Sequence, residues 1–188
     1  MLLVMTKLRQ ARASVFLYFL LCGSAVTVWA THIPVVEKNL SLSHAQIGII
    51  ILLLGGGALA SMQIVGNLVD RHGSAKVLKW ISVALGLTLM LPGLATSYLA
   101  LAVAIFLLGA TIGGIDIAMN AHALEVERAY QRPIFSSFHA MWSIGGVVGS
   151  AVTGAALPAH RDFEDAFGFW IQTRHLHIHP NKMLIQGG

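Results

Sequence analysis

Five long runs that are almost free of charged side chains dominate this chain. They cover residues 13–31, 45–69, 77–94, 98–122 and 133–157, and charges or turn-forming residues bound each run. About 20 apolar residues in a helix cross the hydrocarbon core of a bilayer. The backbone finds no water there, so a spanning segment must be a helix or part of a closed barrel. Apolar runs this long exclude the barrel. The sequence therefore predicts an all-α, polytopic membrane protein with about five transmembrane helices.

Composition supports this prediction. Hydrophobic residues make up 56% of the chain and charged residues only 11%, whereas a soluble domain has about 25% charged residues. The expected organisation is a segment 1–13 outside the membrane, a transmembrane domain 14–157, and a more charged, weakly structured tail 158–188 outside the membrane. The run 13–31 follows three basic residues, as a signal peptide would. Because further spans follow it, we interpret it as the first transmembrane helix.

Basic residues are distributed unevenly between the two sides of the predicted membrane domain. Eight lie on the side of the amino terminus, namely Lys7, Arg9, Arg12, Arg71, Lys76, Lys79, Arg128 and Arg132, whereas the opposite loops carry only Lys38. The positive-inside rule then places the amino terminus in the cytoplasm. Topology accounts for these charges, so the net charge of +4 does not call for a nucleic-acid partner.

A compact polar segment joins the second and third runs. Its pattern is Gly-x-Leu-x-Asp-Arg-x-Gly, followed by one further cation, and its residues are Gly66, Leu68, Asp70, Arg71, Gly73 and Lys76. Gly66 would let a neighbouring helix come close, Asp70 would cap a helix or form an ion pair, and Gly73 would allow a tight reversal. This pattern resembles the loop between helices 2 and 3 of the major facilitator superfamily of secondary transporters. The resemblance implies that these six residues belong to a cytoplasmic gate in a bacterial inner-membrane protein.

The fourth run carries one acid on a face of small and polar residues. Gly109, Gly113, Asp116 and Asn120 follow at spacings of 4, 3 and 4, so they share one side of a helix. Glycines allow a second helix to approach, which turns Asp116 inward. Acids inside a membrane usually line a pathway or relay protons, and the alternative is a structural Asp satisfied by its neighbours. The segment resembles the fourth helix of fucose permease-like transporters, which implies a proton-coupling role for Asp116.

The fifth run places His139, Trp142, Gly146 and Gly149 on one face at spacings of 3, 4 and 3. Its Phe-His-x-x-Trp-Ser-x-Gly-Gly pattern is similar to that of bacterial transporters close to the fucose permease type. His139 and Trp142 are therefore candidate pathway residues beside Asp116 and Asn120. For His139, a hydrogen-bonding role near the helix end is equally compatible with the sequence.

The resemblance implies proton-coupled movement of a small solute by alternating access, and therefore no enzyme and no cofactor. It covers less than half of a complete transporter, so we expect a truncated one, whose partners would be the lipid bilayer, a small solute and protons. The alternative is a non-transporting remnant, or a membrane helper that acts through helix contacts. His175, His177 and His179 alternate in the tail, but no acidic or cysteine ligand accompanies them, and we do not expect a metal site.

Overall fold

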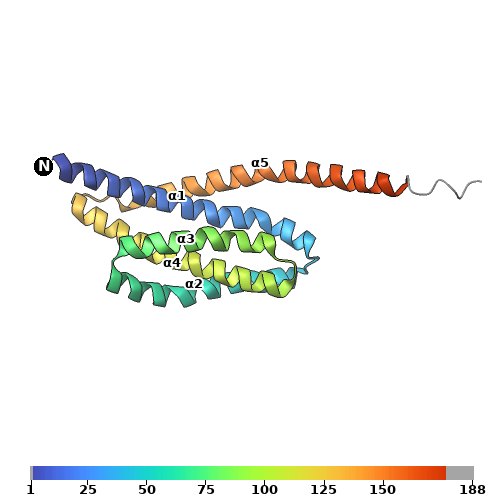
Figure 1. Ribbon diagram of the computed structural model, residues 1–188. Coiled ribbons are helices and arrows are strands. Elements are labelled where there is room, and N and C mark those ends of the chain that lie inside the picture. Colours follow the sequence, from blue (N-terminus) through green and yellow to red (C-terminus); the bar gives the residue numbers. More distant parts are fainter. Residues whose placement is uncertain (1, 177–188) are drawn as a thin grey trace, which may run out of the picture. The chain divides into compact units, whose positions relative to one another are not determined.

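The computed structural model describes the backbone of residues 2–176 and the side chains of residue 6 and residues 8–156 (Figure 1). Every regular element in the described part is a helix: α1 (Leu2–Asn39), α2 (His44–His72), α3 (Ser74–Leu94), α4 (Tyr98–Tyr130) and α5 (Phe135–Leu176). The predicted all-α, polytopic fold is therefore confirmed.

Four helices of the described part are long and apolar enough to cross a membrane. They are Leu8–Asn39, His44–His72, Ser74–Leu94 and Tyr98–Tyr130. The fifth predicted run lies in α5, which is not among these four. Glycines, serines and His139 dilute its apolar residues, so a fifth span stays a prediction.

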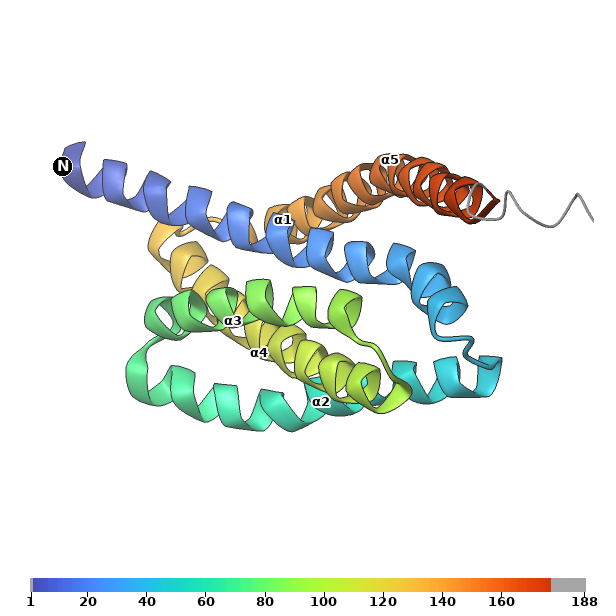
Figure 2. The same ribbon diagram turned by 45° about the vertical axis from the view of Figure 1, so that its right-hand side comes forward.

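The chain divides into two units, Met1–Ser150 and Ala151–Gly188, and the boundary falls inside α5. In the first unit α4 is the central helix, with α1, α2 and α3 packed against it (Figures 1 and 2). Leu101, Ile105 and Leu108 of α4 are fully buried. These large aliphatic side chains make α4 the core of the unit, and α4 also carries the candidate acid Asp116.

Short connections with clear capping residues join the helices. Ser43 and Gln46 form a reciprocal capping box at the start of α2, and Ser97 accepts a hydrogen bond from the Ala100 amide at the start of α4. Gly73 alone separates α2 from α3, with φ of +84°. Residues other than glycine rarely adopt this backbone conformation. The predicted tight reversal at Gly73 is therefore confirmed.

Several helix ends differ from the ends of the apolar runs. α4 continues past His122 to Tyr130, and the backbone of α5 is helical well past Leu157, to Leu176. Hydropathy marks where a helix leaves hydrocarbon, whereas a helix in water ends only where its capping residues stop it. The fifth apolar run begins at residue 133, whereas α5 begins at Phe135.

Glycines bring α2 and α4 into close backbone contact, as their sequence spacing predicted. A Cβ atom added at Gly57 would collide with the carbonyl of Phe106, and one added at Gly109 would collide with the carbonyl of Leu54. Gly113 makes the same kind of approach to Ala58. Close contact between small residues is a main source of helix association in lipid, where helices gain no hydrophobic energy from meeting.

A second glycine seam joins α1 to the first part of α5. Gly145 lies against the carbonyl of Leu20, and Gly149 lies against Ser24. Ser24 adds a hydrogen bond from its hydroxyl to the carbonyl of Gly145, with 2.9 Å between the two oxygens. The sequence predicted a seam on this face through Gly146 and Gly149. Gly149 belongs to it, but Gly145, one residue before Gly146, makes the closer contact.

Candidate functional site

A cavity of about 360 Å³ opens among α1, α2, α4 and α5 within the first unit. Its lining combines apolar side chains with one acid, one imidazole and one indole. The lining residues are Cys22, Val26, Ala58, Met62, Ile112, Gly113, Asp116, Met119, His139 and Trp142. Three of the four predicted pathway residues therefore meet at one cavity, although they come from two different helices.

Asp116 is half-buried and faces this cavity from α4. One turn further along the helix, Asn120 donates a hydrogen bond from Nδ2 to Oδ1 of Asp116 at 3.1 Å. The same amide nitrogen donates to the backbone carbonyl of Asp116 at 2.8 Å. Asn120 therefore contacts the carboxylate without lining the cavity itself. The shared face predicted for Asp116 and Asn120 is present, and Asn120 acts by orienting the acid.

His139 and Trp142 are three residues apart on α5 and both line the cavity. The imidazole of His139 packs edge-on against the ring of Phe19, with 5.1 Å between the ring centroids, and against Phe135 at 5.2 Å. Both His139 and Trp142 are exposed. Aromatic contacts hold the imidazole at the cavity while leaving it accessible, an arrangement that suits a pathway residue better than a structural one.

The cavity lies near the middle of α2 and α4 and beside the first turns of α5. Ala58 is halfway along α2, and Asp116 lies slightly past the midpoint of α4 because α4 continues to Tyr130.

Residues of the predicted gate motif are mostly exposed at the α2–α3 turn. Asp70, Arg71 and Lys76 are exposed, and no hydrogen bond or ion pair involves these three side chains within the described part of the chain. No helix of the described part approaches Gly66, since a Cβ atom added there would meet nothing within 4 Å, so the close approach expected at Gly66 stays a prediction. Its face of α2 has no helix against it among the described residues.

Leu68 and Lys76 lie on another side of the same turn. Together with His72, Val77 and Trp80 they line a separate small cavity between the end of α2 and the start of α3. Leu68 is exposed and faces this cavity, which Asp70 does not line.

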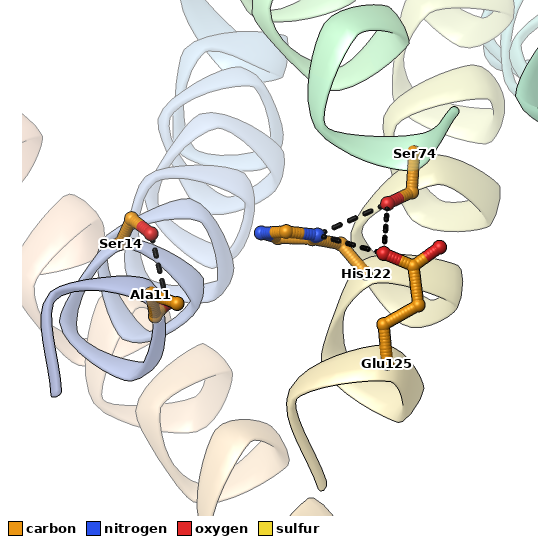
Figure 3. Close-up of polar contacts among 5 residues, drawn as sticks. All are labelled: Ala11, Ser14, Ser74, His122 and Glu125. Carbon is orange, nitrogen blue, oxygen red and sulfur yellow. Dashed lines mark hydrogen bonds and ion pairs between the residues drawn. The ribbon is translucent and has the colours of Figure 1, made fainter. Parts of the chain in front are cut away.

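A polar cluster that sequence reasoning missed ties the start of α3 to α4 (Figure 3). The buried hydroxyl of Ser74 donates to Oε2 of Glu125 at 2.7 Å and lies 3.0 Å from Nδ1 of His122. His122 Nδ1 and Glu125 Oε2 are 3.3 Å apart. Nothing in the spacing connects residues so far apart in the chain.

The structure adds little on the histidine tail. His177 and His179 lie outside the described residues, and nothing is described of the His175 side chain. Within the described part, no group of three or more His, Cys, Asp or Glu side chains is arranged to hold a metal ion.

Comparison with known proteins gives a consistent result. A family model described as Major Facilitator Superfamily matches residues 14–171. An uncharacterized transporter of Sinorhizobium fredii is 42% identical over 133 residues, which are 71% of this chain and 35% of that protein. An uncharacterized MFS-type transporter of Yersinia pestis is 33% identical over 146 residues, 78% of this chain and 38% of that protein.

The membrane protein MosC of Rhizobium meliloti is 28% identical over 142 residues, 76% of this chain and 35% of that protein. No solved structure matches. The chain thus spans little more than a third of the length of the curated relatives that it matches.

Proposed function

Because this chain belongs to the major facilitator superfamily, we propose that it forms one wall of the central pathway of a secondary transporter that moves a small solute coupled to protons. The observation that carries this proposal is the cavity among α1, α2, α4 and α5 that is lined by Asp116, His139 and Trp142. Transporters of this kind hold their substrate at mid-membrane between two helical halves. The surrounding cavity is mostly apolar, as ligand sites usually are, with a few polar groups that fix orientation.

In the proposed mechanism Asp116 carries the proton. Its carboxyl group faces the cavity, where it gains or loses a proton without a movement of α4. Asn120 donates to one carboxylate oxygen, which fixes the direction of the group and leaves the other oxygen free for a proton or a solute hydroxyl. His139 and Trp142 face the same space from α5 and supply an imidazole and a flat indole surface to the solute. Their exposure leaves both available to a solute that binds in the cavity.

We place the exposed Asp70, Arg71 and Lys76 in the cytoplasmic gate. Because these charges have no partner among the described residues, they are available for contacts with other parts of a complete transporter. Gly66 supports this assignment, since its open face on α2 would admit a helix from outside the described part. We expect the protein in the inner membrane of a bacterium.

A chimera tests this function. Residues 1–150 would be joined to the remaining sequence of the Sinorhizobium fredii relative, whose 42% identity favours compatible packing. Energised membrane vesicles would be given a mixture of small solutes, and the accumulated compounds would be identified by mass spectrometry. We expect at least one solute to accumulate only while a proton gradient is present. Equal accumulation with and without the proton gradient would refute proton coupling.

Asp116→Asn is the decisive variant in the same chimera. The amide keeps the volume and hydrogen bonding of the side chain but cannot exchange a proton, so gradient-driven accumulation should fall to the level of empty vesicles while the amount of folded protein stays the same. Asp116→Glu keeps the carboxyl group and should retain part of the coupling. A structural Asp would give the opposite result, namely less folded protein with unchanged coupling per molecule.

A further inference from the structure

A second cavity, separate from the proposed pathway, lies beside the amino-terminal half of α1. It measures about 450 Å³, and its lining residues are Arg9, Arg12, Ala13, Phe16 and Tyr130. Arg9 and Arg12 are three residues apart on α1 and therefore share one face. Tyr130 is the last residue of α4. Two guanidinium groups and a phenol thus surround one space.

The guanidinium group of Arg12 has an unused donor. Its carbon lies 5.2 Å from the ring centre of Phe16 and 5.5 Å from that of Tyr130, so aromatic rings contact the group. An aromatic ring that contacts a guanidinium group interacts with its positive charge. The N–H groups, which point outward in the plane of the guanidinium, form no hydrogen bond in such a contact. Nε of Arg12 is buried and has no hydrogen-bond partner. A buried donor without an acceptor is rare in proteins and indicates a missing ligand.

The neighbouring acids do not neutralise these arginines. No carboxylate lines the cavity, and no ion pair involves Arg9 or Arg12 among the side chains that the structure describes. Glu127, one turn before the end of α4, accepts hydrogen bonds from the backbone amides of Ile134 and Phe135 instead. The cavity therefore has a net positive charge and suits an anion.

The position of the cavity along the helices identifies the kind of anion. Arg12 directly precedes the first apolar run, and Tyr130, whose ring contacts Arg12, lies past the end of the fourth apolar run, so both lie at the level of the lipid headgroups. Guanidinium groups bind phosphate oxygens through pairs of parallel hydrogen bonds. We propose that this cavity binds the phosphate of an anionic phospholipid, with Arg9 and Arg12 as its ligands and Tyr130 as a further donor.

Lipid retention by the purified 188-residue chain tests the proposal. The protein would be delipidated in neutral detergent and titrated with phosphatidylglycerol, and bound lipid would be counted by native mass spectrometry. Arg12→Gln and Arg9→Gln should each weaken binding about tenfold, the loss expected for one charge-assisted contact. Arg132→Gln is the matched control. It removes the same charge from the exposed α4–α5 turn but does not line the cavity, and binding should change less than twofold.

Two further binding measurements distinguish between the possible ligands. Phosphatidylcholine, which has a phosphate but no net charge, should bind more weakly than phosphatidylglycerol, and millimolar inorganic phosphate should not displace the lipid. Displacement by inorganic phosphate would overturn the lipid assignment in favour of a soluble anion. Equal losses in the Arg9, Arg12 and Arg132 variants would overturn the site itself. If Arg12→Gln fails to elute as a single species, the exposed Arg9 variant decides the outcome.

Discussion

Polar side chains inside this apolar chain are satisfied mainly by their own helix or by one neighbouring helix. Thr88 of α3 and Thr111 of α4 share a hydrogen bond of 2.7 Å across two helices. Ser82 instead donates to the carbonyl of Leu78 in its own helix. Back-bonding of this kind costs little and fixes nothing beyond the helix, whereas a bond across helices fixes the relation between them. The hydroxyls of α3 therefore differ in how much they stabilise the packing of α3 against α4.

Ser74→Ala tests this difference. The buried Ser74 hydroxyl connects α3 to Glu125 and His122 of α4. Its loss should lower the free energy of unfolding by about 1 kcal/mol, since Glu125 and His122 still bond to each other. Ser82→Ala, which removes only a bond within one helix, should be close to neutral.

Thermal unfolding of both variants in the same detergent measures the effect of Ser74→Ala. A double-mutant cycle with Glu125→Ala should show that the Ser74 loss depends on Glu125. Equal melting midpoints for Ser74→Ala and Ser82→Ala would show that the cross-helix cluster does not stabilise the protein.

At the scale of helices, sequence spacing predicted which faces meet. The series Gly109, Gly113, Asp116 correctly predicted that two glycines meet a second helix and that the acid faces inward, because a helix fixes the angle between residues three and four apart. The spacing of residues within one run does not tell which other helix packs against that face. The hydrogen bond from Ser74 to Glu125 could therefore not be predicted. The helix ends beyond His122 and Leu157 were missed because hydropathy changes before the helix does.

Two adjacent glycines in α2 give a matched test of the α2–α4 seam. A Cβ atom at Gly57 would collide with the backbone of Phe106, whereas one at Gly56 meets nothing within 4 Å. Gly57→Ala should lower the free energy of unfolding by about 1–3 kcal/mol through overpacking. Gly56→Ala should be neutral or slightly stabilising, because alanine favours the helix by up to about 1 kcal/mol. Thermal unfolding in detergent measures both, and equal behaviour would mean that the helices do not pack through Gly57.

Glu127 offers a test of how α5 begins. Its Oε2 atom accepts hydrogen bonds from the amides of Ile134 and Phe135, at 2.7 and 2.5 Å. Glu127→Ala should free these amides and cost about 1 kcal/mol, as the loss of a helix cap does. Hydrogen exchange at Ile134 and Phe135 should become faster, while Glu127→Gln, which keeps an acceptor oxygen, should show a smaller change.

Glu125→Ala is the control for this exchange experiment, since Glu125 bonds to Ser74 and His122 rather than to α5. Unchanged exchange at Ile134 and Phe135 in Glu127→Ala would mean that another group caps α5.

At the scale of the whole membrane unit, large apolar side chains face outward. Leu52, Leu59, Trp80 and Leu99 are each at least 70% exposed. A water-soluble protein rarely carries so much apolar surface, and in lipid these side chains need no protein partner. Hydrophobicity alone therefore does not decide which apolar side chains of this unit are buried, and the small residues and polar contacts at the helix seams help to determine which faces meet.

The distribution of basic residues predicts how this unit is oriented. The start of α1, the α2–α3 turn and the α4–α5 turn lie at the same end of the unit (Figure 1), and together they carry eight of the nine Lys and Arg residues in or beside the predicted loops. We expect this end in the cytoplasm. Single cysteines at Ala75 and at Ser97 would report the two ends, in a chain whose one natural cysteine, Cys22, is replaced by alanine.

Ala75 is chosen over its neighbour because Ser74 is only 1% exposed, whereas Ala75 and Ser97 are both exposed. A membrane-impermeant maleimide added to intact cells should label the cysteine at Ser97 and leave the one at Ala75 unmodified. After detergent solubilisation both should react, which shows that the protected cysteine was shielded by the membrane rather than by the fold. Labelling at Ala75 alone would reverse the orientation. It would also place Asp70 and Arg71 outside the cell, where they could not belong to a cytoplasmic gate.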